Sequence, residues 1–364
     1  MNNKYDSNRI VKEAYENLDV YVDSFETIKD IHTDLMYGEP IEDDRDILLT
    51  LIIPTYNRDV LLKEAINSVL NQKPVDYIWE FIIIDNTELD ENQETPALRI
   101  VREIGNKKIM YYHNRVNIGS GYNWNRGVQL AKGKWICLLH DDDVLCMDAL
   151  ANIGKLIRKF FDLKKPLGYI HARSFKFQDS FDEKCIRFKN LCFNLELTRL
   201  TTLLLGHTHT GMPTCGTTIL REAYIEAGGI NYDFGPTADA VLGYIIMKNY
   251  TVLRSGVILG GYRWGCNETL KVSTIEKLLQ SDSLFAEYRY QNTILGILWK
   301  KLFGDCQKYI NYCSKNKLIK INNKKMKPVL CYTYKKSIVS LCIYKLCLNL
   351  IKFIMCIKGI VLYS

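Results

Sequence analysis

The sequence predicts an α/β fold built around a mostly parallel sheet, and three observations support this prediction. Short apolar runs alternate with segments of helical periodicity between residues 47 and 145, which is the pattern of consecutive βαβ units. The apolar runs lack polar alternation, as expected of strands buried on both faces. Polar residues follow each run directly, at the carboxyl ends of the strands, where sheets of this kind bind ligands.

The elements of the first half follow from the positions of apolar and turn residues. The strands expected in chain order are 47–53, 81–84, 109–112 and 135–139. Pro54 is expected to end the first strand, because proline donates no hydrogen bond to a sheet. Asp59 is a suitable N-cap for a helix of about three turns. A second helix is expected at about 121–131, before the fourth strand.

Three adjacent carboxylates, Asp141, Asp142 and Asp143, follow the fourth strand. Like charges at one strand end repel one another unless a cation neutralises them, and carboxylate oxygens are ligands that suit Mg²⁺ or Mn²⁺. A solvated acidic loop is the alternative. Polar clusters after all four strands favour a shared metal and ligand site, since equivalent strand ends converge. These clusters are Thr55-Tyr56-Asn57, Asp85-Asn86, Asn117 and the aspartate triplet.

A further unit follows residue 220. A short helix is expected at 221–227, ended by Gly228 and Gly229, because glycine readily adopts the conformation that ends a helix. After a loop at 231–236, Asp239 opens a helix that extends to about Asn249. A carboxylate at this position is often only a favourable helix cap, so a catalytic role and a capping role both remain open for Asp239.

Taken together, these segments resemble the family 2 glycosyltransferases of the GT-A fold. The segments that carry the resemblance are 50–72, 81–87, 117–145 and 227–242, within about 47–269. The resemblance implies a Rossmann-like, mostly parallel sheet flanked by helices, with an α-helical C-terminal extension. The domains expected are a polar, partly helical extension at 1–46, the GT-A domain at 47–269 and a basic helical region at 270–364.

The resemblance also implies roles for single residues. Asp239 aligns with the catalytic base, while Asp142 and Asp143 align with the metal site and imply Mn²⁺ or Mg²⁺ as the cofactor. The residues implied in donor-nucleotide binding are Pro54, Thr55, Tyr56, Asp85, Asn117 and Asp141. Within this set, Tyr56 and Asp85 would hold the base, and Asp141 would contact the ribose or the water shell of the metal.

The chain departs from the family pattern at two positions. His140 replaces the usual first aspartate of the metal motif, and Ala238 replaces a glutamate that usually precedes the base. Arg263 occupies a late loop and is a candidate for pairing with the diphosphate, although a surface arginine flanked by aromatic residues is the simpler interpretation. His207 and His209 are candidates for a metal pair or for the acceptor cleft.

Charge is distributed unevenly along the chain. The net charge is −8 over residues 1–46 and +13 over residues 271–364. The apolar segment 337–362 contains three lysines, which argues against a simple transmembrane helix and favours a basic amphipathic helix on a membrane surface. A helix packed on the catalytic domain or in a dimer is the alternative. Long apolar runs make nucleic acid a poor partner for this segment.

These features predict a metal-dependent, inverting glycosyltransferase. It would transfer a sugar from a nucleotide-sugar, most simply a UDP-sugar, to a saccharide or lipid-linked saccharide acceptor in polysaccharide biosynthesis. The twelve cysteines form no CxxC pair and several lie in apolar runs, which favours a reducing cytoplasmic setting, with the protein peripheral on the inner face of the membrane. A catalytically silent scaffold and a nucleotidyltransferase remain as alternatives, although no Gly-rich basic phosphate loop is found near the N-terminus.

Overall fold

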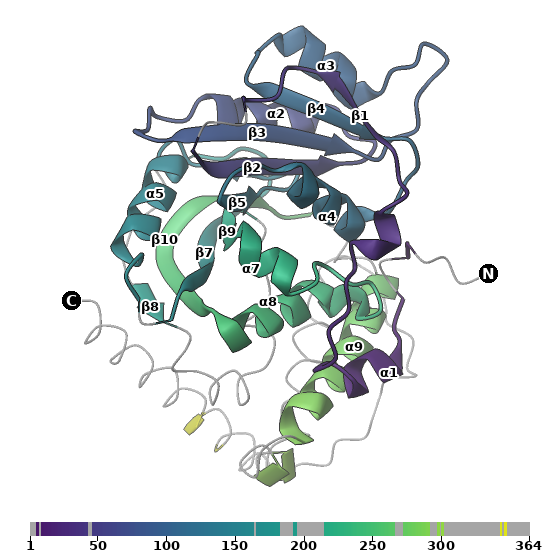
Figure 1. The fold of residues 1–364 in the computed structure, drawn as a ribbon, viewed down its shortest axis with the longest axis vertical. Helices are drawn as coiled ribbons and strands as arrows, with labels where there is room; N and C mark the ends of the chain where they lie inside the picture. Colours follow the sequence, from purple (N-terminus) through teal and green to yellow (C-terminus); the bar gives the residue numbers. More distant parts are fainter. Residues whose placement is uncertain are drawn as a thin grey trace.

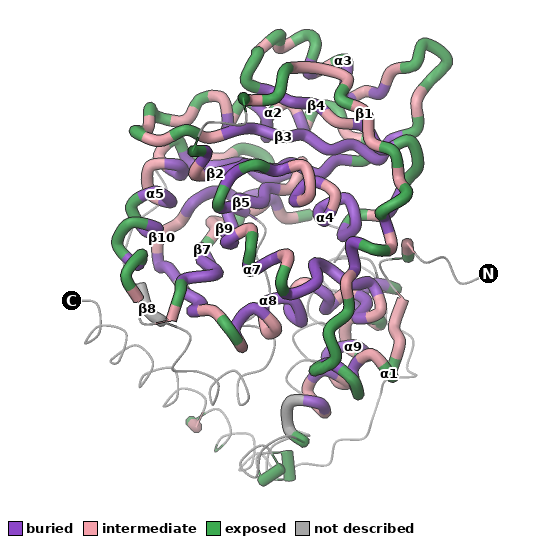
Figure 2. The backbone as a smooth tube through the Cα atoms, in the orientation of Figure 1, coloured by how far each residue is buried: buried purple, intermediate pink, exposed green. Residues whose placement is uncertain are grey.

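The computed structural model describes residues 5–6, 9–42, 46–163, 165–182, 192–194, 215–265 and 272–291, with a few isolated positions after 296. Within these residues a ten-stranded sheet runs in the order β1-β4-β3-β2-β5-β9-β7-β10-β6, and β8 pairs with β10. The central strands are almost entirely buried (Figure 2). Helices pack around this sheet (Figure 1), which confirms the expected α/β class.

Four parallel strands form the first half of the sheet. They are β2 (Ile47–Thr55), β3 (Ile78–Asp85), β4 (Ile109–Asn114) and β5 (Trp135–Leu138). Their inner residues are fully buried, as the absence of polar alternation predicted. The expected end at Pro54 is wrong, because β2 continues to Thr55, whose carbonyl accepts a hydrogen bond from the Asn86 N–H at 3.1 Å. The missing donor of Pro54 therefore does not end the pairing with β3.

The second half of the sheet is mixed rather than parallel. Its strands are β6 (Val144–Leu145), β7 (Leu167–Phe177), β8 (Cys192–Asn194), β9 (Thr217–Leu220) and β10 (Thr251–Arg263). β9 runs antiparallel to both β5 and β7, whereas β7 and β10 are parallel. β6 pairs antiparallel with β10, so the chain that leaves the aspartate triplet runs directly beside β10.

The helices cover the faces and ends of the sheet. They are α2 (Val60–Leu70), α3 (Pro96–Ile104), α4 (Ser120–Leu130), α5 (Ala149–Lys159), α7 (Arg221–Glu226), α8 (Ala238–Asn249) and α9 (Val272–Gln291). The Asp59 side chain accepts a hydrogen bond from the Val60 N–H at the start of α2, as predicted. α4 approaches β2 closely at Gly127, where the lack of a side chain is required because a Cβ atom would lie only 2.7 Å from Ile52 Cγ2.

The N-terminal residues are packed into the same body. They form α1 (Lys12–Glu16), the 3-10 turn η1 (Glu26–Ile28) and β1 (Thr33–Tyr37), which is antiparallel to β4 at the sheet edge. Tyr15, Leu18 and Ile28 belong to the main hydrophobic core. α1 contacts α9, and the two lie together in Figure 1.

Among the described residues, no helix combines the length and the hydropathy needed to cross a bilayer. Nearly all of the predicted amphipathic segment, 337–362, lies outside the described residues, and so do His207 and His209. The predictions made for them stay untested.

Candidate functional site

The aspartate triplet lies in a tight turn between β5 and β6. The Asp143 N–H donates to the His140 carbonyl at 3.2 Å, which closes the turn. Asp142 and Asp143 are buried, and Asp141 is mostly covered. The solvated acidic loop considered as an alternative is therefore excluded by the burial of these side chains.

The turn after β2 contacts this triplet directly. The Thr55 hydroxyl donates to Asp141 Oδ2 at 2.8 Å. The Arg58 guanidinium lies 3.3 Å from Asp141 Oδ1 and 3.4 Å from Asp142 Oδ2. The first and last of the four polar clusters thus converge at one edge of the sheet, as the equivalent strand ends predicted.

Arg263, at the end of β10, holds the backbone of the triplet. Its N–H donates to Asp143 Oδ1 at 2.8 Å, and its Nε donates to the Asp142 carbonyl at 2.9 Å. Its remaining nitrogens contact Glu64 and the carbonyls of Gln178 and Asp179. The expected surface position is wrong, because Arg263 is only 5% exposed. Pairing of β6 with β10 places Arg263 beside Asp143.

His140, Asp142 and Asp143 have ligand atoms that all lie within 4.8 Å of one another. Asp143 Oδ2 is buried and has no hydrogen-bond partner among the described residues. Burial raises the pKa of Asp143 to about 8 and that of Asp141 to about 6, and burial lowers the pKa of His140. Carboxylate oxygens and a neutral imidazole form a donor set that fits Mn²⁺ or Mg²⁺. Asp143 Oδ2 would then coordinate the cation.

Asp85, at the end of β3, is fully buried. Its Oδ1 accepts from the Thr87 N–H and hydroxyl at 2.8 and 2.6 Å, and its Oδ2 accepts from the Tyr111 hydroxyl at 2.6 Å. Tyr56, the other residue expected at the base, is 49% exposed. The structure therefore fixes the Asp85 carboxylate rigidly, with Tyr111 as a supporting residue that sequence reasoning missed.

Buried asparagines connect the remaining strand ends. The Asn114 amide donates to Asn86 Oδ1 and Asn123 Oδ1, both at 2.8 Å, and Asn123 donates to the Ile84 carbonyl at 3.0 Å. These amides tie the ends of β3 and β4 to α4. Asn117, the predicted residue of this cluster, is exposed, and its side chain accepts from the Gly119 N–H at 2.9 Å.

Asp239 is the second residue of α8, which begins one residue earlier than expected. Its Oδ1 accepts from the Ala240 N–H at 2.7 Å, and the side chain is half-buried. The N-cap of α8 is Thr237 and no side chain caps the helix there, so Asp239 is not the cap, although its charge in the first turn favours the helix. The role as catalytic base stays a prediction.

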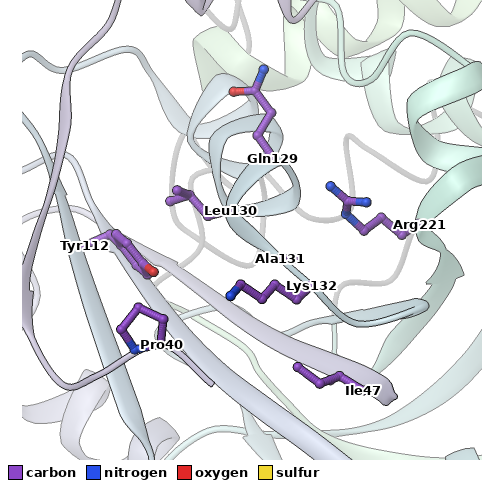
Figure 3. A pocket seen from close by; sticks show the side chains of 8 residues that line it. All are labelled: Pro40, Ile47, Tyr112, Gln129, Leu130, Ala131, Lys132 and Arg221. Atoms are coloured by element: carbon purple, nitrogen blue, oxygen red, sulfur yellow. The ribbon is translucent and has the colours of Figure 1, made fainter. Parts of the chain in front are cut away.

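A hollow of about 530 Å³ lies beside the amino end of β2, at the opposite end of that strand from Thr55 (Figure 3). Two cationic side chains, Lys132 and Arg221, line it together with Pro40, Ile47, Tyr112, Gln129, Leu130 and Ala131. Because none of the predicted site residues lines this hollow, it is separate from the aspartate site.

Comparison with known proteins identifies the domain. The glycosyl transferase family 2 profile matches residues 50–226. An uncharacterised glycosyltransferase of Mycoplasma genitalium is 35% identical over 112 residues, which cover 30% of this chain and 37% of that protein. The abequosyltransferase RfbV of Salmonella typhimurium is 36% identical over 105 residues, which cover 29% of this chain and 31% of RfbV. The chain therefore spans about a third of the length of these relatives.

Among solved structures, residues 1–349 of Staphylococcus aureus TarS match with a TM-score of 0.50 and 13% identity, covering 80% of this chain and 76% of TarS. This likeness supports the expected GT-A fold. The family profile includes the ends of β2, β3, β4 and β5 and the whole aspartate triplet. Residues 50–226 therefore match glycosyl transferase family 2 and include the ends of β2, β3, β4 and β5, whereas the end of β10, with Arg263, lies outside the match.

Proposed function

We propose that this protein is a metal-dependent, inverting glycosyltransferase. It would transfer a sugar from a nucleotide-sugar donor, a UDP-sugar, to a saccharide or lipid-linked saccharide in polysaccharide biosynthesis. The observation that carries the proposal is the buried aspartate triplet at the converging strand ends of a family 2 domain, where Asp143 Oδ2 has no partner among the described residues.

Different residues at this edge of the sheet would bind the metal and the diphosphate of the donor. His140, Asp142 and Asp143 would hold Mn²⁺ or Mg²⁺, which would stabilise negative charge on the leaving diphosphate as a Lewis acid. Thr55 orients Asp141 through the 2.8 Å hydrogen bond. Arg58, with a side chain 33% exposed, supplies a second positive charge at the same edge.

Two further carboxylates would act on the nucleotide base and on the acceptor. Asp85, held by Tyr111 and Thr87, would accept a hydrogen bond from a uracil N–H. Asp239 would accept the proton of the acceptor hydroxyl, which requires a carboxylate within hydrogen-bond reach of that oxygen. Attack from the face opposite the diphosphate inverts the anomeric centre.

Calorimetric titration tests the donor site. UDP, GDP, CDP and their sugar conjugates are titrated with and without Mn²⁺, and a UDP compound is expected to bind only with the metal. Asp142→Asn should abolish this metal-dependent binding, whereas the nearby Asp148→Asn should leave it unchanged. Unchanged UDP affinity of Asp142→Asn with Mn²⁺ would exclude the proposed metal site.

Asp239→Asn separates binding from chemistry. The variant is expected to bind the UDP-sugar as the wild type does while hydrolysis of that sugar nucleotide to UDP and free sugar, with water in the place of the acceptor hydroxyl, collapses. Retained turnover would dismiss Asp239 as the base. A catalytically silent scaffold is the second candidate, favoured by Ala238 in place of the usual glutamate. Failure of every nucleotide to bind would support that scaffold.

We also propose that the protein associates with the inner face of the cytoplasmic membrane. The support is the net charge of +13 over residues 271–364 combined with the apolar segment 337–362. Lysine and arginine side chains near an anionic surface each contribute about 1 kcal/mol to binding. Such a location would suit a lipid-linked acceptor.

A further inference from the structure

The loop that leads into Asp239 is held by residues 9–15 of the N-terminal segment, which we call the N-terminal strap. Ile10 forms an antiparallel bridge with Phe234. The Val11 N–H donates to the Asp233 carbonyl at 2.8 Å, and Arg9 Nε lies 3.0 Å from Asp233 Oδ1. The strap therefore pairs with the loop through both backbone and charge.

Tyr15 makes the contacts nearest to Asp239. Its hydroxyl donates to the Phe234 carbonyl at 2.6 Å and lies 2.7 Å from Thr237 Oγ1. Its ring packs edge-on against Phe234, with the ring centroids 5.1 Å apart. Tyr15 is only 1% exposed, so these contacts are shielded from water. A single side chain thus fixes both ends of the turn η5 (Gly235–Thr237), which directly precedes α8.

The crossing of strap and loop requires a glycine. Gly235 has a φ of +54°, and a Cβ atom there would lie 2.8 Å from Ile10 Cγ1 and 2.9 Å from the Arg9 carbonyl oxygen. No other residue type fits this backbone conformation and this close approach without strain. The loop therefore approaches the strap this closely only because Gly235 has no side chain.

The opposite side of the loop is fixed by α4. The Tyr232 hydroxyl lies 3.0 Å from Ser120 Oγ and accepts from the Gly121 N–H. The Asn125 side chain accepts from the Ile230 N–H and donates to its carbonyl, both at 2.9 Å. α4 lies within the residues that the family profile matches and the strap lies outside them, so the loop is held between the matched domain and the N-terminal segment.

The Tyr15 hydroxyl also lies within electrostatic reach of the proposed base. Burial raises the pKa of Tyr15 well above its ordinary value, and the charges of Asp282 and Asp239 raise it further. The hydroxyl therefore stays protonated and remains a hydrogen-bond donor to the loop.

We propose that the N-terminal strap positions Asp239 for proton abstraction and that Tyr15 is its positioning residue. The inference rests on the proposed function of Asp239 as the base. Proton transfer requires the carboxylate within hydrogen-bond reach of the acceptor hydroxyl, and a displacement of about 1 Å can lower the rate about a hundredfold. Loosening the loop should therefore impair turnover while the donor site, built on β2, β3 and β5, keeps its affinity.

The test compares Tyr15→Phe with Tyr21→Phe in the full-length protein. Tyr15→Phe keeps the ring and removes the hydroxyl, and the Phe234 carbonyl keeps the Thr237 hydroxyl as a partner at 3.0 Å. Tyr21, in the same N-terminal segment, is 62% exposed and serves as the matched control. The kcat and KM for UDP release from the UDP-sugar that binds in the titration are measured, together with Mn²⁺-dependent UDP affinity.

Tyr15→Phe is expected to lower kcat about tenfold, equivalent to about 1.4 kcal/mol, with KM and UDP affinity unchanged. Arg9→Gln, which removes a partly exposed ion pair and spares the core, is expected to lower kcat by about threefold, equivalent to about 0.6 kcal/mol. Wild-type kcat in both variants would overturn the proposal. If Tyr15→Phe does not fold or loses UDP affinity, Arg9→Gln decides, and its unchanged kcat would overturn the proposal.

Asp239→Asn distinguishes failure of the proposed base from failure of the strap proposal. If Asp239→Asn keeps wild-type turnover, the proposed base is wrong and the strap has no base to position. If Asp239→Asn loses turnover while Tyr15→Phe and Arg9→Gln keep it, only the strap proposal fails.

Discussion

Above pH 8, where Asp143 is ionised, its replacement with asparagine is expected to stabilise the metal-free protein and to remove most of the stabilisation that Mn²⁺ provides. Asp143 is fully buried beside Asp142, and one of its oxygens has no partner among the described residues. The substitution removes a buried charge but keeps an oxygen that can accept from the Arg263 N–H. The same change removes a proposed metal ligand, so the two effects have opposite signs.

The magnitude follows from the separation of the carboxylates. Above the pKa of about 8 of Asp143 both carboxylates are ionised. Ligand atoms of Asp142 and Asp143 lie within 4.8 Å of each other, and two like charges at that distance repel by about 3 kcal/mol at an effective dielectric constant near 20. Burying the new amide group without a hydrogen-bond partner costs about 1 kcal/mol and reduces this gain. The net stabilisation is then about 2 kcal/mol, which corresponds to a rise in Tm of about 3 °C.

Thermal denaturation at pH 8.5, above the pKa of Asp143, with EDTA and with saturating Mn²⁺ tests the prediction. Wild type should gain about 2.7 kcal/mol when Mn²⁺ is at a hundred times its Kd, whereas Asp143→Asn should gain little. Asp148→Asn, a substitution five residues later outside the cluster, is the control and should behave as wild type in both conditions. A lower Tm in EDTA, or a full Mn²⁺ shift in Asp143→Asn, would refute the reasoning.

Two other predictions concern the support of the site and the C-terminal segment. Arg263→Lys should lower the free energy of unfolding by about 3 kcal/mol, because one ammonium group cannot replace a buried guanidinium that contacts both Glu64 and the Asp142 carbonyl. Calorimetry measures this with the exposed Arg158→Lys as the control, and equal Tm values for the two variants would contradict the prediction. Truncation after residue 328 should release the protein from anionic vesicles in a sedimentation assay while nucleotide binding persists, and continued sedimentation would refute the membrane role.

The parallel half of the fold could be predicted because burial on both faces leaves a local signal. The runs that form β2, β3, β4 and β5 are continuous in the sequence, so their positions need no knowledge of distant contacts. β9 was missed because its four residues form no distinctive pattern, and its antiparallel pairing depends on where β5 and β7 lie. β1 was missed because an edge strand with partly exposed residues resembles the polar segments around it.

The site was predictable where its residues follow strands and unpredictable where distant residues support them. The aspartate triplet could be predicted because three adjacent carboxylates directly follow an apolar strand. Arg263 lies 121 residues from Asp142 in sequence, and only the pairing of β6 with β10 brings them together. Tyr111 contacts Asp85 from 26 residues away, across the neighbouring strand. No local pattern reports such pairs, although both involve ordinary polar residues in otherwise apolar strands.

The two arginines at the acidic edge differ in what they can neutralise. Arg263 is buried and uses its donors largely on backbone carbonyls, so it fixes the shape of the triplet more than it compensates its charge. Arg58 is a third exposed and lies at 3.3 and 3.4 Å from its partners, a geometry that contributes about 1 kcal/mol or less. The side chains therefore leave part of the negative charge uncompensated. Above the raised pKa of Asp143 that residual charge costs stability in the metal-free protein, and it is also the attraction that the proposed divalent cation would use.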